Sequence, residues 1–200
     1  MFPLGSVLFP TAVLPLHVFE PRYLQLAEDC LAGDREFGVV LIERGSEVGG
    51  EDVRSSVGTV ARIVESQQFE DRRWALAAVG VRRIRVSRWL PDDPYPLAEV
   101  TDWPDPAPTR DLGPDHDEIT NLLRRCLGLA AEVGEAAAPA TIELSDDPVV
   151  GALQASFLAP IGPLDQQRLL GAPSPEVRSA DLIETLAETA EVLVARLALG

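Results

Sequence analysis

The chain has 200 residues, 46% of them hydrophobic, and a formal net charge of −15. This length permits one or two domains, each with a core that needs no disulfide or metal. The negative charge repels polyanions, so it disfavours nucleic acid and anionic membranes as general partners.

All 17 basic residues are arginine, because the sequence contains no lysine. A phosphate-binding loop and a serine–lysine dyad both require a lysine. The sequence also lacks a Gly-x-Ser-x-Gly motif, and its only histidines are His17 and His116. We therefore predict that the chain is not an enzyme and uses no cofactor and no metal.

The two cysteines, Cys30 and Cys126, are too far apart in sequence for a zinc motif or a disulfide framework. We interpret both as buried, reduced thiols of a cytoplasmic protein. No apolar run reaches the length of a membrane span, so we expect no membrane partner.

The first elements are short and extended. Pro3, Pro10 and Pro15 interrupt the opening segment, which predicts extended pieces over residues 4–9 and 13–18, suited to sheet edges. Glu20-Pro21 is typical of a helix start, and Gly33 is a plausible stop. The apolar stripe of this helix is Tyr23, Leu24, Ala27, Cys30 and Leu31.

Further strands follow this helix. We expect a buried strand over residues 37–42, a loop containing Gly45–Gly50, and then strands over residues 57–65, 74–79, 81–89 and 95–102. The pair at 74–79 and 81–89 is predicted to break at Gly80. Strands with a single helix indicate a mostly antiparallel β domain against which that helix packs.

The remaining sequence is helical in pattern. Four prolines between residues 103 and 114 predict a linker. Ile119, Leu122, Leu123, Cys126, Leu127 and Ala130 have helical spacing. Asp147-Pro148 and Ser174-Pro175 are helix starts, and a short helix spans 164–170. We predict a β-rich domain over residues 1–103, a proline-rich linker over 104–114 and a helical bundle over 115–200.

Several motifs resemble the substrate-binding N-terminal domain of Lon proteases, the LON domain. They are Phe2-Pro3-Leu4-Gly5-Ser6-Val7-Leu8-Phe9-Pro10, Leu14-Pro15-Leu16-His17-Val18-Phe19-Glu20-Pro21-Arg22-Tyr23 and Phe37-Gly38-Val39-Val40-Leu41-Ile42, with weaker matches to residue 100. The chain is similar to a stand-alone bacterial form that lacks the ATPase and protease domains. The resemblance implies an α+β fold with a PUA-like β-barrel-type domain. Asp71-Arg72-Arg73 departs from the family's frequent Asp-Gly-Arg turn.

The resemblance implies a non-catalytic module that recognises unfolded or degron-bearing polypeptides, or an adaptor in protein quality control beside a protease or chaperone. Candidate anchors are Phe69, Trp74, Trp89 and Trp103, with apolar residues that flank the Gly45–Gly50 loop. Core packing is the alternative role for these aromatic residues.

A second hypothesis is nucleic-acid binding, since PUA-like folds often bind RNA. Its candidate patch is Arg82, Arg83, Arg85 and Arg88, on a predicted hairpin from Arg72 to Arg88. Pairing with Glu65, Glu70 and Asp71 on a solvated strand face is the competing interpretation. An enzyme with an unrecognised site and a small-ligand module are further alternatives, and the sequence leaves the client and the oligomeric state open.

Overall fold

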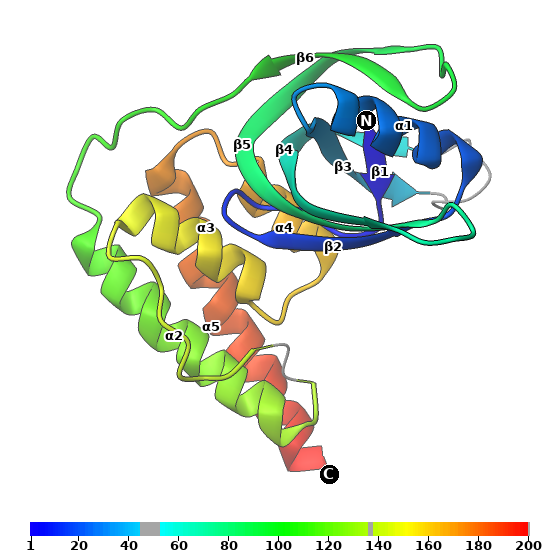
Figure 1. Ribbon diagram of the computed structural model, residues 1–200. Helices are drawn as coiled ribbons and strands as arrows, with labels where there is room; N and C mark the ends of the chain where they lie inside the picture. The colour runs from blue at the N-terminus through cyan, green and yellow to red at the C-terminus, as the bar shows by residue number, and fades with distance from the viewer. Residues whose placement is uncertain (45–52, 136–137, 200) are drawn as a thin grey trace. The chain divides into compact units, whose positions relative to one another are not determined.

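The computed structural model describes residues 1–44, 53–135 and 138–199. The chain divides into two compact units, Met1–Pro104 and Asp105–Gly200 (Figure 1). Among the described residues, the first unit holds every strand together with helix α1, and the second holds helices α2 to α5. The fold is therefore mixed α+β, as the sequence predicts.

The first unit is built on one six-stranded sheet. Its strands are β1 (Phe2–Leu4), β2 (Val13–Val18), β3 (Glu36–Arg44), β4 (Val53–Gln68), β5 (Trp74–Leu90) and β6 (Leu97–Asp102). Their order is β1-β3-β4-β5-β2, and β6 also pairs with β5. All pairs are antiparallel except β1 with β3, which is parallel.

The two proline-containing strands lie at the ends of this order, which confirms that the opening segment forms sheet edges. Strand β2 has the predicted bounds. The extended piece predicted over residues 4–9 is wrong except at Leu4, because β1 is Phe2–Leu4 and residues 5–12 connect the two strands. Val7, Leu8 and Phe9 are nonetheless buried, so this connection contributes to the core.

The predicted break at Gly80 is wrong, because β5 runs without interruption from Trp74 to Leu90. Gly80 instead permits a close backbone approach. A Cβ atom there would lie 2.1 Å from the carbonyl oxygen of Phe9. The Gly80 N–H donates to the carbonyl of Ala12 at 2.9 Å, and its own carbonyl accepts from Thr11 at 2.8 Å. Gly80 thus allows a close contact between β5 and the segment before β2, and it does not interrupt the strand.

The predicted hairpin from Arg72 to Arg88 is also wrong, because residues 74–90 form one continuous strand. The true hairpin joins β4 to β5 through a turn in which Phe69 N–H donates to the carbonyl of Arg73 at 2.9 Å. Arg72 lies in this turn with a φ of 70°, the left-handed region that glycine adopts without strain. The four arginines of the candidate patch, Arg82, Arg83, Arg85 and Arg88, lie in the second half of β5, away from the turn.

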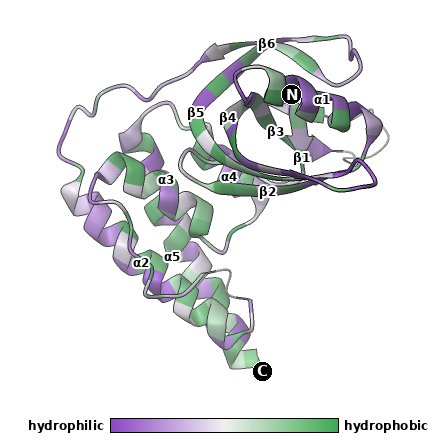
Figure 2. Cartoon of the chain, in the orientation of Figure 1, coloured by the Kyte–Doolittle hydropathy of each residue, from purple (hydrophilic) through white to green (hydrophobic). Residues whose placement is uncertain are grey.

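Helix α1 (Pro21–Ala32) begins and ends as predicted, with Glu20 as N-cap, Pro21 in the first turn and Gly33 as C-cap. Its buried residues are Tyr23, Leu26 and Ala27, so the predicted stripe is correct in part. The Tyr23 ring stacks on Phe2, with ring centroids 4.1 Å apart. This stack fixes β1 against α1, and the strands around it are largely hydrophobic (Figure 2).

The second unit contains α2 (Gly113–Glu132), α3 (Pro148–Leu158), α4 (Pro163–Leu170) and α5 (Pro175–Leu199). Helices α2 and α5 pack together, and α3 contacts both of them. The predicted α2 stripe is confirmed except for the half-buried Leu122. Asp147 caps α3 by accepting from Val149 and Val150. The sequence pattern favours Val149, Val150, Leu153 and Phe157 as the inward residues of α3. Of these Leu153 is buried, Val149 and Val150 are half-buried and Phe157 is exposed, because small residues such as Ala152, Ala155 and Ser156 form much of the buried face.

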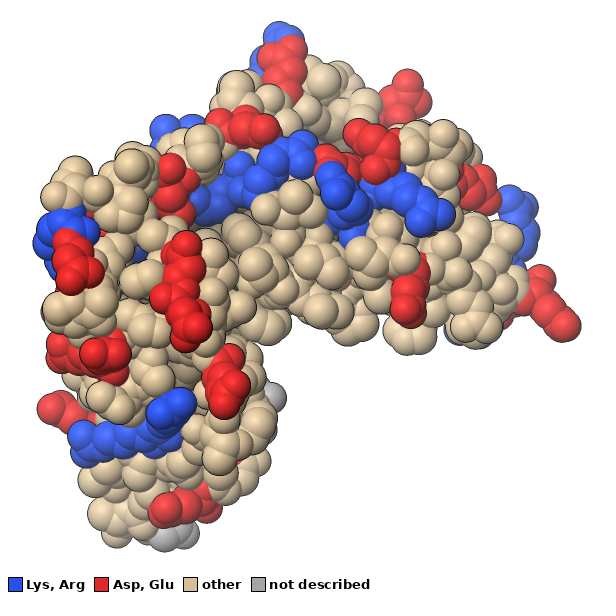
Figure 3. Space-filling view, turned by 60° about the vertical axis from the view of Figure 1, so that its left-hand side comes forward, with Lys and Arg blue, Asp and Glu red and all other residues tan. Residues whose placement is uncertain are grey.

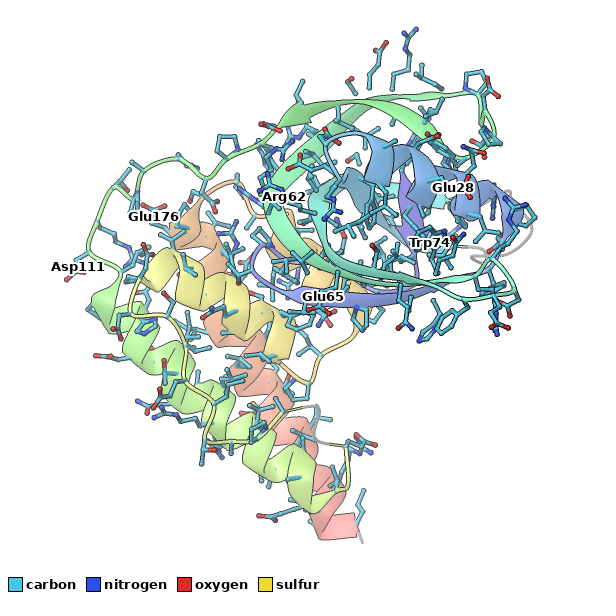
Figure 4. All side chains as sticks on the ribbon, viewed as in Figure 1. Glu28, Arg62, Glu65, Trp74, Asp111 and Glu176 are labelled. Carbon is cyan, nitrogen blue, oxygen red and sulfur yellow. The ribbon has the colours of Figure 1, made fainter. Side chains whose placement is uncertain are left out.

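The proline-rich segment after residue 104 is bonded to α5 within the second unit. The fully buried Arg178 donates to both carboxylate oxygens of Asp105 at 2.9 Å and to the Leu169 carbonyl at 3.1 Å. Thr109 donates its N–H and its hydroxyl to Glu176 at 2.5 and 2.9 Å (Figure 4). These bonds hold the segment against the start of the last helix.

Candidate functional site

Phe69 and Trp74, two of the predicted anchors, lie together at the turn end of β4 and β5. With His17, Val18, Phe19 and Arg73 they line a hollow of about 180 Å³, here called the aromatic hollow. Phe19 is 61% exposed and Phe69 is 39% exposed. The guanidinium of Arg73 lies 6.0 Å from the Phe69 ring centroid and also bonds to Asp71, which fixes one wall of the hollow.

Trp74 is half-buried at the first position of β5 (Figure 4). Its Nε1–H is buried and has no acceptor among the described residues. A buried donor without an acceptor costs free energy, and because this Nε1–H is shielded from solvent it offers no contact point to a ligand.

Phe19 was missed in the sequence analysis, although a signal for it exists. Val13, Pro15, His17 and Phe19 alternate with Leu14, Leu16 and Val18 along one extended run. The structure exposes the first set, and Val18 is buried. Strand alternation therefore placed Phe19 on the same exposed face as His17.

A larger open groove shares His17 with the aromatic hollow. It has a volume of about 570 Å³ and is lined by Pro15, Leu16, His17, Glu65, Ser66, Gln67, Ala75, Leu76 and Ala77. These residues come from β2, β4 and β5, so the surface named here the β2–β5 groove lies on the sheet itself. Its lining combines small and aliphatic side chains with the polar side chains of His17, Glu65, Ser66 and Gln67.

The other two predicted anchors, Trp89 and Trp103, do not join the aromatic hollow. Trp89 lies near the opposite end of β5, where the Arg54 guanidinium is 4.7 Å from its ring centroid. Trp103 follows β6, and the guanidinium groups of Arg83 and Arg85 lie 4.3 and 4.1 Å from its centroid. Both rings are half-buried and serve as platforms for arginine.

The four arginines of the nucleic-acid hypothesis are engaged within the first unit. Arg82 bonds to Glu36 at 2.6 Å and to Asp102 at 2.9 Å, and Arg88 bonds to Glu99 at 2.5 Å. Arg83 is only 3% exposed. Figure 3 shows arginine side chains in a broken row with carboxylates between them. The face is ion-paired, but the partners of Arg82 and Arg88 are Glu36, Asp102 and Glu99 and not the expected Glu65, Glu70 and Asp71.

Glu36 is the centre of the arginine network. It accepts from Arg62 at 2.6 Å as well as from Arg82. Desolvation opposes its ionisation, but the hydrogen bonds from Arg82 and Arg62 hold the pKa of Glu36 below its usual range. The network thus links β3, β4 and β5 as charged pairs and leaves little free positive charge for phosphate.

The described residues give no sign of metal or membrane chemistry. In residues 1–44, 53–135 and 138–199, no group of three or more His, Cys, Asp or Glu side chains is placed to hold a metal ion. No helix in those ranges is long and apolar enough to cross a membrane. Both cysteines are free thiols, and burial raises the pKa of Cys30 to about 11, which makes it a poor nucleophile.

The Gly45–Gly50 loop, a predicted flank of the binding surface, lies outside the described residues. Of the positions beside it, Val53 is exposed and Ile42 is half-buried.

Comparison with known proteins identifies the family. The family model of the ATP-dependent protease La (LON) substrate-binding domain matches residues 1–188. Lon protease 2 of Sorangium cellulosum is 31% identical over 159 residues, which cover 72% of this chain and 20% of that protein. Lon protease 2 of Herpetosiphon aurantiacus is 27% identical, covering 95% of this chain and 23% of the relative. The chain thus spans less than a quarter of either protease.

Solved structures show the same fold. The crystal structure of a Lon N-terminal domain protein from Xanthomonas campestris has 30% identity and a TM-score of 0.69, covering 92% of this chain and 95% of that one. The N-terminal domain of the Mycobacterium avium complex Lon protease has 19% identity and a TM-score of 0.66, covering 92% and 96%. The chain therefore belongs to the LON substrate-binding domain family.

Proposed function

We propose that this chain is a substrate-recognition module that binds unfolded or tagged polypeptides, through the aromatic hollow and the β2–β5 groove. The observation that carries the proposal is the hollow itself, where exposed Phe19 and Phe69 flank Trp74. Unfolded chains expose apolar side chains and backbone carbonyls. The apolar side chains find partners here in the exposed aromatic rings.

The net charge of −15 supports a polypeptide partner over a polyanion. It also keeps a protein with exposed aromatic residues apart from its copies. The resemblance to Lon implies a protease or chaperone as the downstream partner, a PUA-like barrel in the first unit and a cytoplasmic location. The chain itself would supply binding and no catalysis.

The proposal is tested by binding of a short unfolded probe, the reduced and alkylated B chain of insulin, whose net charge is close to zero. Fluorescence anisotropy with the full chain should give a dissociation constant that is micromolar at best, roughly −8 kcal/mol. Affinity should change little between low and moderate salt, because apolar contacts are not screened.

Single-stranded RNA in the same titration is the contrasting probe. Binding through arginines would fall steeply with salt as counterions are released. Tight, salt-sensitive RNA binding that Arg85→Ala and Arg88→Ala abolish, with no binding of the B chain, would contradict the proposal and support the nucleic-acid hypothesis.

A further inference from the structure

Strand β2 has an open edge, and its backbone polarity is arranged to accept another strand. Within residues 1–44, 53–135 and 138–199 the sheet order ends at β2, and the strand that pairs with it is β5. The facing residues include Leu14 with Ala78, Pro15 with Ala77 and Leu16 with Leu76.

Hydrogen bonds at the start of β2 determine which backbone groups point outward. The Gly80 N–H donates to the Ala12 carbonyl at 2.9 Å. In an antiparallel ladder, facing pairs alternate between bonded and non-bonded, so pairs two residues apart are alike. Leu14, Leu16 and Val18 therefore bond to β5, while the backbone groups of Val13, Pro15 and His17 point away from it.

The position of Pro15 agrees with this assignment, since its missing N–H falls on the outward side and costs no bond to β5. The remaining outward groups are the N–H of Val13 and His17 and the carbonyls of Val13, Pro15 and His17. Among the described residues, no hydrogen bond from outside the β2–β5 pair reaches these groups. The three residues that carry these groups are all exposed, and Val13 is 58% exposed.

A second hollow adjoins the same edge. It has a volume of about 120 Å³, close to that of one medium-sized apolar side chain, and its apolar lining is Phe2, Leu4, Leu16, Val18, Phe19 and Tyr23. A strand paired with β2 would direct every second side chain toward one face of the sheet. Backbone pairing with an apolar side chain at alternate positions is the chemistry of strand addition.

We propose that a client polypeptide binds as an extended strand added to the free edge of β2, with an apolar side chain in the hollow beside β1. The inference rests on the proposed function and deepens it, because it specifies the bound conformation. Backbone pairing makes recognition largely independent of client sequence, as a module for unfolded chains requires.

The probe is a synthetic fluorescent peptide of alternating threonine and valine with a lysine at each end. Its matched control carries a methyl group on every threonine and valine backbone nitrogen, which removes the N–H donors and keeps the side chains. The full chain should bind the parent peptide at least about tenfold more tightly, because several backbone bonds are lost. Equal or tighter binding of the methylated peptide would overturn the proposal.

Two variants at one position test the edge from the protein side. His17→Pro removes an outward N–H without removing a bond to β5, and it should weaken parent-peptide binding by about tenfold through the lost bond and the bulk of the ring. His17→Ala also loses the imidazole but keeps the N–H, so His17→Pro should bind the parent peptide about tenfold more weakly than His17→Ala. If His17→Pro does not fold, the methylated peptide on the wild-type protein decides alone.

The outcomes separate this inference from the proposed function. If the B chain binds but methylation has no effect, the edge proposal fails and substrate recognition stands. If neither the B chain nor the peptide binds, both fail. A wild-type dimer that His17→Pro converts to a monomer, with no peptide bound, would assign the edge to a second copy and overturn the proposal.

Discussion

The two units differ in where their aromatic residues lie and in how their polar groups are hydrogen-bonded. All aromatic residues except Phe157 lie in the first unit, where Phe19, Phe69 and Trp74 line one hollow. In the part of the chain that the structure describes, no hydrogen bond from outside the β2–β5 pair reaches the outward backbone groups of β2. The large apolar side chains of the second unit are aliphatic apart from Phe157. Its proline-rich entry segment is hydrogen-bonded to α5 through Asp105 and Thr109. The contrast supports the proposal that the sheet recognises polypeptide and that the helices support it.

The contrast also extends to the charges. In the first unit, Glu36 is shared between two arginines, and Trp103 lies under two more. These contacts tie neighbouring strands together. In the second unit one buried pair, Arg178 with Asp105, joins residues that are 73 positions apart. Loss of the Arg178 side chain should therefore destabilise the second unit more than loss of any one arginine side chain destabilises the first.

The largest effect is expected for Arg178→Ala. It leaves the Asp105 carboxylate and the Leu169 carbonyl without their buried partner, which should lower the unfolding free energy of the second unit by about 3–5 kcal/mol. Urea unfolding followed by helical circular dichroism reports mainly on the second unit. Tryptophan fluorescence reports on the first, which contains all three tryptophans.

Only the circular dichroism transition should move to lower urea in Arg178→Ala. The matched control, Arg196→Ala, breaks an exposed pair with Glu135 and should have little effect. An equal shift of both signals would show that the two units unfold as one and would break the comparison.

Two glycines give the next largest contrast. Gly80→Ala in β5 forces a Cβ atom against the Phe9 carbonyl and should cost about 1–3 kcal/mol or more, seen in the fluorescence transition. Gly128→Ala in α2 meets no atom within 4 Å and should stabilise the helical signal by about 0.5–1 kcal/mol. A neutral Gly80→Ala would refute the close approach between β5 and the segment before β2.

A smaller gain is expected at the β4–β5 turn. Arg72→Gly should raise the stability of the first unit by about 0.5 kcal/mol, since relief of a positive φ gives about 1–2 kcal/mol and the freer unfolded chain offsets about 0.4–1 of it. Arg73→Gly, one residue later, has no positive φ to relieve and should destabilise. Equal effects at both positions, measured by urea midpoint, would count against the turn geometry.

The smallest effect concerns Glu176. Hydrogen bonds from the Thr109 backbone N–H, and then from its own backbone, Ser174 and the Thr109 hydroxyl, lower the pKa of this carboxyl to about 2. A lowered pKa means that the contribution to stability is present above about pH 4.5 and is lost as the pH falls toward 2. The helical transition of Glu176→Gln should depend less on pH across this window, and identical pH profiles would rule the contact out.

Local signals in the sequence predicted much of this fold. The helix start at Glu20-Pro21, the cap at Asp147 and the buried stripe of α2 all follow from interactions between residues a few positions apart. The bounds of β2 follow from its flanking turn residues and its alternation.

The remaining features depend on contacts between distant segments. Gly80 looked like a strand break because its partner, Phe9, is 71 positions away and leaves no mark on the local pattern. Contacts between residues far apart in sequence also include the stacking of Arg83 and Arg85 on Trp103 and the buried Arg178–Asp105 pair. Of the aromatic hollow, Phe69 and Trp74 are candidate anchors from the sequence, whereas strand alternation shows only that Phe19 is exposed, and its place beside them depends on the pairing of β2 with β5.

The central claim is that the first unit recognises unfolded polypeptide, and one affinity comparison tests it most directly. The double variant Phe19→Ser/Phe69→Ser removes the exposed rings of the aromatic hollow, and Leu164→Ser/Val192→Ser removes two comparably exposed apolar residues of the second unit. With the alkylated B chain as probe, the first variant should lose about tenfold or more in affinity. The second should stay within about twofold of the wild type. Unchanged binding in the first variant, or an equal loss in the second, would contradict the account.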